Sequence, residues 1–162
     1  MRIGHGWDLH RLELGRPCRI GGLELPHDKG PLGHSDGDVV LHALADALLG
    51  AAALGDIGLF FPDTDPRWKG ADSARLLAEV MDRVRSAGFA LGNADITVVA
   101  QEPKIGPYRQ ALRENIARLL GTDLSRVSVK AKTTEGLGDI GAGEAIACHA
   151  VVLLEEGDQV IK

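Results

Sequence analysis

Three side chains in the first quarter of the chain are of types that bind metal ions. Asp8 and His10 stand two residues apart near the end of a predicted strand, and His42 lies near the start of a predicted helix. Because side chains alternate along a strand, Asp8 and His10 are expected on the same side of it. Two imidazoles and one carboxylate suit Zn²⁺ with an open fourth position, which is typical of catalytic sites.

A structural role is the alternative for His42, since spacing alone does not join it to Asp8 and His10. In that case His42 is a partly exposed helix residue paired with Asp46. If His42 binds a metal ion, its other ring N–H needs an oxygen acceptor, often a carboxylate. Asp38 and Asp46 lie four residues before and after it, on the same helical face. The spacing does not choose between these two carboxylates.

A second candidate site follows the predicted strand 127–133. Lys132, Thr133 and Thr134 lead into a segment with glycines at positions 136, 138, 141 and 143. A strand followed by such a loop can present backbone N–H groups to an anion. Glu135 adds a hard oxygen ligand for Mg²⁺ or Mn²⁺ beside these donors. The alternative is an ordinary loop between two strands.

Two further segments carry polar groups that suit a phosphorylated polyol. The acidic segments 56–58 and 61–65 could accept hydrogen bonds from sugar or polyol hydroxyls, or they could be solvated turns. The helix start at residues 33–38 could bind phosphate through its free N–H groups. Its alternative is an ordinary N-cap, made by Ser35 or Asp36.

The elements that must position these residues follow strand and helix patterns. Strands are predicted at 1–10, 94–100, 127–133 and 145–154, with strand pieces around a Gly-Gly turn in 19–25. Helices are predicted at 38–53, 73–87 and 107–120, and loops at 26–33 and 55–70. Both faces of the segment 145–154 are apolar, as in a strand covered on two sides. Three helices can cover one side of a small mixed sheet, and another copy of the chain is the economical cover for the other. We therefore expect an α+β fold with helices on one face of the sheet, in a homo-oligomer.

Composition limits the classes of function. The 162 residues suit one domain, and the net charge of −5 comes without a cluster of Lys and Arg, so a nucleic-acid partner is not expected. Cys18 and Cys148 fit no CxxC spacing and are expected to be reduced thiols. No segment approaches the ~20 apolar residues of a membrane span. These features predict a cytoplasmic protein without a membrane partner.

Four segments together are more specific than any one of them. RIGHGWDLH, HSDGDVVLHALADALLGAAALGDIG, FPDTDPRWKGADS and KTTEGLG with GEAIAC occur in this order. They resemble the 2-C-methyl-D-erythritol 2,4-cyclodiphosphate synthases, lyases of the non-mevalonate isoprenoid pathway. The resemblance extends from residue 1 to about residue 155 and implies a single synthase domain, 1–162. It also implies a homotrimer in which the sheets pack together and the active sites lie between subunits.

The activity that the resemblance implies is an intramolecular phosphoryl transfer. The substrate is 4-diphosphocytidyl-2-C-methyl-D-erythritol 2-phosphate, whose own 2-phosphate attacks the β-phosphorus so that CMP leaves. No protein nucleophile is needed, and positioning contributes much of the rate. Two other functions remain open on the residues alone: a metal-dependent phosphoesterase that activates water, and a non-catalytic trimeric module that binds nucleotide.

The resemblance also assigns roles to individual residues. Zn²⁺ or a similar ion is expected at Asp8, His10 and His42, and Mg²⁺ or Mn²⁺ at Glu135. The expected catalytic residues, as stabilisers of the transition state, are His34 and Thr133. The expected substrate contacts are Asp8, His10, His34, Ser35, Asp56, Ile57, Gly58, Phe61, Asp63, Asp65, Ala100, Lys104, Ile105, Lys132, Thr133, Thr134 and Glu135.

Three positions depart from the family pattern. Asp139 and Ala142 stand where many relatives carry an aromatic residue and an arginine that face the central cavity of the trimer. This change argues against binding of an isoprenoid diphosphate in that cavity. Lys132 replaces a commoner threonine, which is expected to add a phosphate contact and to leave the chemistry intact.

Overall fold

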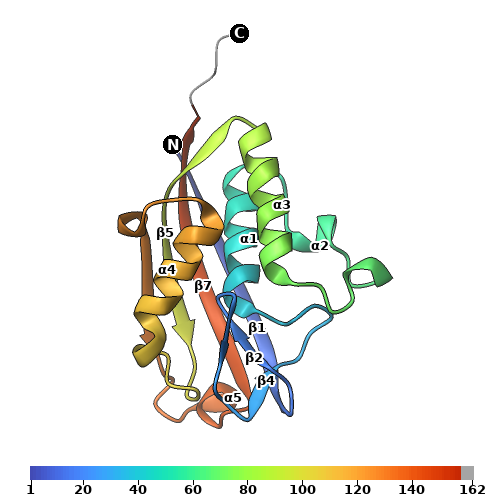
Figure 1. The fold of residues 1–162 in the computed structure, drawn as a ribbon, viewed down its shortest axis with the longest axis vertical. Helices are drawn as coiled ribbons and strands as arrows, with labels where there is room; N and C mark the ends of the chain where they lie inside the picture. Colours follow the sequence, from blue (N-terminus) through green and yellow to red (C-terminus); the bar gives the residue numbers. More distant parts are fainter. Residues whose placement is uncertain (158–162) are drawn as a thin grey trace.

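A five-stranded mixed sheet forms the centre of the computed structural model, which describes residues 1–157 (Figure 1). The strand order is β4-β1-β7-β5-β6, with β5 and β6 parallel and the other pairs antiparallel. The strands are β1 (Arg2–Leu14), β4 (Lys29–Pro31), β5 (Phe89–Val99), β6 (Val127–Lys132) and β7 (Ala145–Glu156). A separate hairpin joins β2 (Cys18–Ile20) to β3 (Leu23–Leu25). The predicted mixed sheet is confirmed; residues 158–162 of the predicted domain lie outside the described part.

Helices cover one face of this sheet, as predicted (Figure 1). They are α1 (Val39–Ala51), α3 (Ser73–Ser86) and α4 (Arg109–Leu120). Helix α1 packs against β1 and β7, and α3 packs on the outside of α1. Among residues 1–157, the helices are all too short or too polar to cross a bilayer.

The bounds of two long strands and the presence of several short elements differ from the sequence prediction. Strand β1 continues to Leu14, β5 begins at Phe89, and β4 lies within the predicted loop 26–33. The predicted loop 55–70 contains helix α2 (Ile57–Phe60) and the 3-10 turn η1 (Pro66–Trp68). Further short elements are η2 (Gly106–Tyr108), η3 (Leu124–Arg126) and α5 (Gly138–Gly141). Elements of three or four residues are too short to show a hydrophobic period, which is why the sequence pattern missed them.

The N-cap of α1 is Asp38, so the prediction of Ser35 or Asp36 was wrong. One oxygen of Asp38 accepts hydrogen bonds from the N–H groups of Val40 and Leu41. Two more N–H groups, from the turn between β2 and β3, also reach the Asp38 carboxylate. Ser35, Asp36 and Asp38 are all of types that cap helices. The hydrogen bonds from the turn between β2 and β3 favour Asp38 among them.

Strand β1 packs unusually close to helix α1 because two of its inward positions are glycines. A Cβ added at Gly4 would lie 1.9 Å from the carbonyl oxygen of Ala47, and one at Gly6 would lie 1.8 Å from that of Ala43. Only glycine leaves room for the helix backbone at these positions. The close approach brings the inward side chains of β1 to the start of α1.

The opposite face of the sheet is largely uncovered by this chain and carries apolar residues beside the stacked pair His5 and His149 and the ion pair of Asp95 with Lys130. On β7, Val151 is 38% exposed, and on β1 the outward residues Ile3, Trp7 and Leu9 are 74%, 50% and 45% exposed. On the inward side of β7, the residues from Ile146 to Leu154 are buried. The prediction that β7 is apolar on both faces is confirmed for the inward face and holds on the outward face except at the exposed His149. The prediction that another copy covers the outward face stays a prediction.

Candidate functional site

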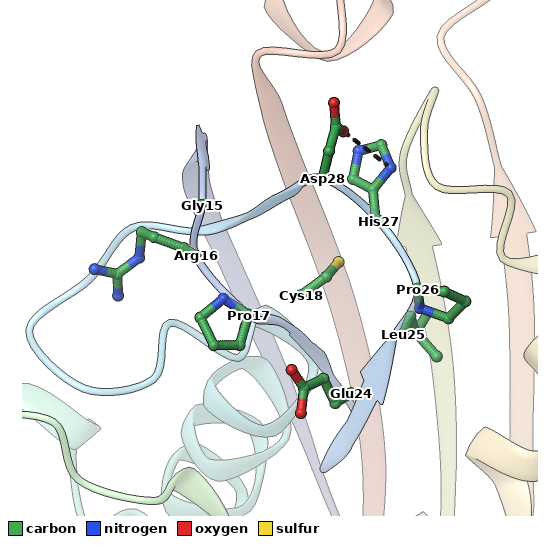
Figure 2. A pocket seen from close by; sticks show the side chains of 9 residues that line it. All are labelled: Gly15, Arg16, Pro17, Cys18, Glu24, Leu25, Pro26, His27 and Asp28. Carbon is green, nitrogen blue, oxygen red and sulfur yellow. Dashed lines mark ion pairs between the residues drawn. The ribbon is translucent and has the colours of Figure 1, made fainter.

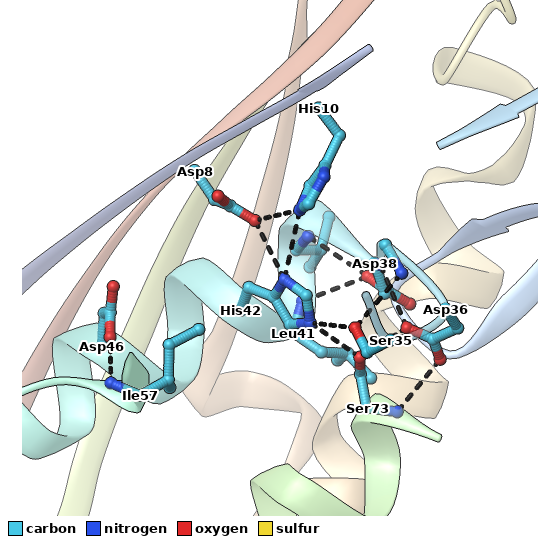
Figure 3. Close-up of polar contacts among 12 residues, drawn as sticks. Asp8, His10, Ser35, Asp36, Asp38, Leu41, His42, Asp46, Ile57 and Ser73 are labelled. Carbon is cyan, nitrogen blue, oxygen red and sulfur yellow. Dashed lines mark hydrogen bonds and ion pairs between the residues drawn. The ribbon is translucent and has the colours of Figure 1, made fainter. Parts of the chain in front are cut away.

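Asp8, His10 and His42 converge on one point between strand β1 and helix α1 (Figure 3). Asp8 Oδ2 lies 2.9 Å from His10 Nε2 and 3.0 Å from His42 Nδ1, and the two ring nitrogens are 3.3 Å apart. Asp8 and His10 share the inward side of β1, as the alternation predicted. Within residues 1–157 these three form the only cluster of metal-ligand type. The structure thus joins the three residues that sequence spacing could not join.

The orientation of His10 is set by the backbone. His10 Nδ1 lies 2.7 Å from the carbonyl oxygen of Leu32. A carbonyl only accepts hydrogen bonds, so Nδ1 carries the hydrogen and donates it. The other nitrogen, Nε2, then faces Asp8 and His42. A backbone acceptor on one nitrogen with the other turned to a shared point is the usual arrangement of a metal-binding histidine.

The electrostatics of the cluster favour a negative Asp8. Burial alone raises the pKa of Asp8, but hydrogen bonds and charge from His10 and His42 outweigh it and lower that pKa to about 2. Burial alone lowers the pKa of His10, but the hydrogen bond and charge of Asp8 raise it above its ordinary value. The carboxylate is therefore held ionised at neutral pH, in the form that binds a cation.

The second nitrogen of His42 is held by hydroxyl groups, so both carboxylates considered for this role were wrong. His42 Nε2 lies 3.0 Å from Ser35 Oγ and 2.9 Å from Ser73 Oγ. Asp38 is engaged in capping α1, and Asp46 accepts the N–H of Ile57 at 2.8 Å. His42 is 8% exposed, so the alternative of a partly exposed residue paired with Asp46 is also wrong.

Sequence reasoning gave Ser73 no role. Ser73 lies 31 positions after His42, at the first residue of α3. Serine at a helix start is common for local reasons, so its type carries no signal of this contact. Only the packing of α3 against α1 brings the two side chains together.

The three residues line a cavity of about 390 Å³. Six further predicted substrate contacts line the same cavity: His34, Ser35, Ile57, Gly58, Phe61 and Asp63. Pro62, Trp68 and Leu76, for which no role was predicted, complete its wall. The helix start and the acidic loop therefore face the same space as the candidate metal ligands.

Asp56 and Asp65, two predicted contacts from the same acidic loop, do not line this cavity in the single chain. Asp56 caps α2 through the N–H of Leu59. Asp65 caps η1 and forms an ion pair with Arg67 at 2.6 Å. Hydrogen bonds from Arg67 lower the pKa of Asp65. Both carboxylates accept hydrogen bonds from nearby backbone N–H groups, in line with the alternative that these segments are turns.

A second cavity, of about 360 Å³, lies at the ends of β5 and β6. Its wall includes five predicted contacts: Ala100, Lys104, Ile105, Lys132 and Thr133. Thr134 lines a different cavity, together with Trp7 and Asp139 on the uncovered face of the sheet.

Glu135 is exposed and lines neither of the two cavities that hold most of the predicted contacts. Its N–H reaches Thr133 Oγ1 at 3.2 Å. Its backbone is left-handed, with φ of 55°, which is uncommon for a residue other than glycine. Most of the predicted substrate contacts therefore lie around two separate cavities, one beside His42 and one beside Thr133.

A further cavity lies away from the cavities beside His42 and Thr133 (Figure 2). It measures about 560 Å³ and is lined by residues 15–18 and 24–28. Burial raises the pKa of the Cys18 thiol to about 11, and the nearby charges of Asp38 and Glu24 add to this, so the thiol stays protonated at neutral pH. Volume alone does not locate the chemistry here, because this cavity holds no group of converging metal ligands.

Comparisons with known proteins agree with the motif pattern. A family model described as the YgbB family matches residues 1–155. The 2-C-methyl-D-erythritol 2,4-cyclodiphosphate synthase of Trichlorobacter lovleyi is 59% identical over 154 residues, which cover 95% of this chain and 98% of that protein.

Two solved structures are also similar. A structure of 2C-methyl-D-erythritol-2,4-cyclodiphosphate synthase, described as its CDP-bound form, matches with a TM-score of 0.88 and 48% identity, covering 95% of this chain and all (100%) of that one. The bifunctional IspDF of Campylobacter jejuni matches with a TM-score of 0.93 and 46% identity over 97% of this chain. This chain spans 42% of the length of that bifunctional protein.

Proposed function

This chain belongs to the YgbB family, and we propose that its cyclodiphosphate synthase reaction takes place around Asp8, His10 and His42. The reaction converts 4-diphosphocytidyl-2-C-methyl-D-erythritol 2-phosphate into 2-C-methyl-D-erythritol 2,4-cyclodiphosphate and CMP. The observation that carries the proposed location is the convergence of one carboxylate oxygen and two ring nitrogens within 3.3 Å of one another.

The ligand set suits Zn²⁺ or a similar divalent transition metal. Three ligands of mixed nitrogen and oxygen type leave a fourth position for substrate. His10 supports this fit because the Leu32 carbonyl occupies its other nitrogen. When bound, such an ion supplies Lewis-acid polarisation of a phosphoryl oxygen.

Residues of the same cavity are suited to holding the reacting phosphates. His34 and Ser35 lie beside the metal ligands, and Ile57, Gly58 and Asp63 form the part of the wall that would contact the methylerythritol unit. An oxygen of the 2-phosphate attacks the β-phosphorus, and the bond from that phosphorus to the oxygen of the α-phosphate breaks. That oxygen leaves with CMP. The chain contributes orientation, because nucleophile and electrophile belong to one molecule.

The cytidine half of the substrate fits the second cavity, at the ends of β5 and β6. Lys104 and Lys132 bring positive charge to its wall, and Thr133 brings a hydroxyl. Glu135, two residues beyond Thr133, would hold Mg²⁺ or Mn²⁺, which would offset the negative charge of the phosphates. Binding of cytidine diphosphate by a similar protein supports this assignment.

We propose that these two cavities are half-sites, which meet between neighbouring subunits of a homotrimer. The half-sites are lined by different residues within one chain. The uncovered sheet face, with Ile3, Trp7, Leu9 and Val151 exposed, provides the apolar surface for packing sheet against sheet. Each copy would then supply metal ligands to one site and Glu135 to the next. A single domain spanning 1–162 and a cytoplasmic location belong to the same proposal.

Mixing two inactive variants tests the shared site. His42→Ala and Glu135→Ala should each lose nearly all formation of CMP and cyclic product while keeping the fold. Trimers refolded from an equal mixture should regain about a quarter of the wild-type rate, because one random pairing in four joins two intact halves.

The matched control is a mixture of His42→Ala with His10→Ala, which should stay inactive because both changes affect the same half. Mixed trimers that form, as shown by native mass spectrometry, but stay inactive would overturn the shared site. Full activity of Glu135→Ala alone would remove Glu135 from the mechanism.

A further inference from the structure

His42 has two different surroundings for its two ring nitrogens (Figure 3). Nδ1 faces the carboxylate of Asp8 at 3.0 Å, and Nε2 faces the hydroxyl groups of Ser35 and Ser73. A neutral imidazole carries its hydrogen on only one nitrogen. The tautomer of His42 therefore decides whether Nδ1 has the free lone pair that a metal ion needs.

Ser73 is constrained by a carboxylate on its other side. Its hydroxyl donates to Asp36 Oδ1 at 2.5 Å, and its backbone N–H donates to Asp36 Oδ2 at 3.0 Å. A serine hydroxyl has one hydrogen, and Asp36 takes it. Toward His42, which is 2.9 Å away, the Ser73 oxygen can then act only as an acceptor. This contact favours the tautomer of His42 with hydrogen on Nε2, and it competes with the ionised Asp8 carboxylate, which at 3.0 Å favours hydrogen on Nδ1 when no metal ion is bound.

Ser35 does not fix the tautomer by itself. Its oxygen accepts the N–H of Gly37 at 3.3 Å, and its own hydrogen has no assigned acceptor. Ser35 can therefore act as donor or acceptor toward His42 Nε2. With Nε2–H given to the two serine oxygens, the hydrogen of Ser35 is free to point into the cavity that Ser35 lines.

We propose that Ser73, oriented by Asp36, is a positioning residue that holds His42 in the tautomer with hydrogen on Nε2 and a free lone pair on Nδ1. Ser73 is 1% exposed and does not line the cavity, so it acts through His42. Indirect partners of this kind typically change metal affinity by about 10- to 100-fold. The proposal rests on the metal site proposed above. It adds that Ser73 and Asp36 keep the lone pair of His42 Nδ1 available to the metal ion.

The same contacts explain why the hydroxyl can be removed without unfolding the site. The segment before α3 is fastened to the loop before α1 by backbone bonds: Gly70 N–H donates to the His34 carbonyl at 2.7 Å, and Asp36 N–H donates to the Ala71 carbonyl at 3.1 Å. The backbone N–H of residue 73 also keeps its bond to Asp36 in any variant. Ser73→Ala thus removes the hydroxyl and leaves these three bonds.

Nitrogen-15 NMR of the metal-free protein tests the tautomer directly. In histidine-labelled wild type, two-bond ¹H–¹⁵N correlations should show His42 with hydrogen on Nε2. In Ser73→Ala this preference should shift toward the tautomer with hydrogen on Nδ1, or to a mixture. Zinc affinity, measured by competition with a chelator, should fall about 10- to 100-fold. Ser86→Ala, an exposed serine at the other end of the same helix, should leave both measurements unchanged.

Ser73→Thr, which keeps the hydroxyl, should restore the tautomer and most of the zinc affinity. The proposal is overturned if wild-type His42 carries its hydrogen on Nδ1. It is equally overturned if folded Ser73→Ala keeps both the Nε2–H tautomer and zinc affinity within about twofold of wild type. A wild type with the expected tautomer that binds no zinc would instead overturn the proposed metal site, so the two failures are distinguishable.

Discussion

Adding one methyl group at Gly6 should damage both stability and metal binding. The new Cβ would lie 1.8 Å from the carbonyl oxygen of Ala43, whereas ordinary contacts begin near 3.4 Å. Strand β1 must therefore move from α1 by about 1.6 Å, since a backbone oxygen inside a helix cannot turn away. Overpacking of this kind costs about 3 kcal/mol of unfolding free energy.

The same movement separates the metal ligands. Asp8 lies two residues beyond Gly6 on β1, and His42 precedes Ala43 on α1, so the 3.0 Å distance between Asp8 Oδ2 and His42 Nδ1 spans the widened gap. Metal sites tolerate changes in ligand distance of only about 0.2 Å. Zinc affinity of Gly6→Ala should therefore fall by at least about 100-fold.

Urea unfolding and chelator competition measure the two effects at one protein concentration. For Gly6→Ala the unfolding midpoint should fall by about 1–2 M urea. The control is Gly50→Ala, in α1, where an added Cβ meets nothing within 4 Å. Gly50→Ala should raise the unfolding free energy by about 0.5–1 kcal/mol and keep zinc affinity. A Gly6→Ala protein with wild-type midpoint and zinc affinity would refute the close packing of β1 on α1.

Three further predictions follow from single side chains. Asp38→Ala should lower the unfolding free energy by about 2–4 kcal/mol in urea titrations, because four backbone N–H groups lose their acceptor; an unchanged midpoint would contradict this. Because burial raises the pKa of Cys18 to about 11, its thiolate fraction, and so its alkylation rate in the folded protein, should be low at pH 8 and rise as the pH approaches 11; mass spectrometry that finds rapid labelling at pH 8 would count against it. His42→Ala should lose tightly bound zinc by elemental analysis while its oligomeric state by light scattering is unchanged, and full zinc occupancy would refute its role as a ligand.

The long elements and the ligand types of the site followed from the sequence. The apolar residues of α1, α3 and α4 predicted all three helices: α3 and α4 each bury one stripe, and α1, between the sheet and α3, is buried on almost all sides. Alternation placed Asp8 and His10 on one side of β1 correctly. Helix periodicity and strand alternation depend on residues close together in the sequence, so a single segment is enough to predict them.

Contacts between distant segments could not be predicted in the same way. The oxygen partners of His42 come from Ser35 and from Ser73 on another helix, and helix packing decides that contact. The choice of Asp38 as N-cap depends on a turn about 16 residues earlier in the chain. Gly4 and Gly6 did carry a signal, because small residues at alternate strand positions indicate close approach of another backbone.

The most direct test of the account is the fate of solvent oxygen during turnover. Purified enzyme reconstituted with Zn²⁺ and Mg²⁺ is incubated with 4-diphosphocytidyl-2-C-methyl-D-erythritol 2-phosphate in ¹⁸O-water, and the products are analysed by mass spectrometry. Attack by the substrate's own 2-phosphate predicts CMP and the cyclic diphosphate, both without ¹⁸O. A linear phosphate product that carries ¹⁸O would contradict cyclisation and show that the site around Asp8, His10 and His42 activates water instead.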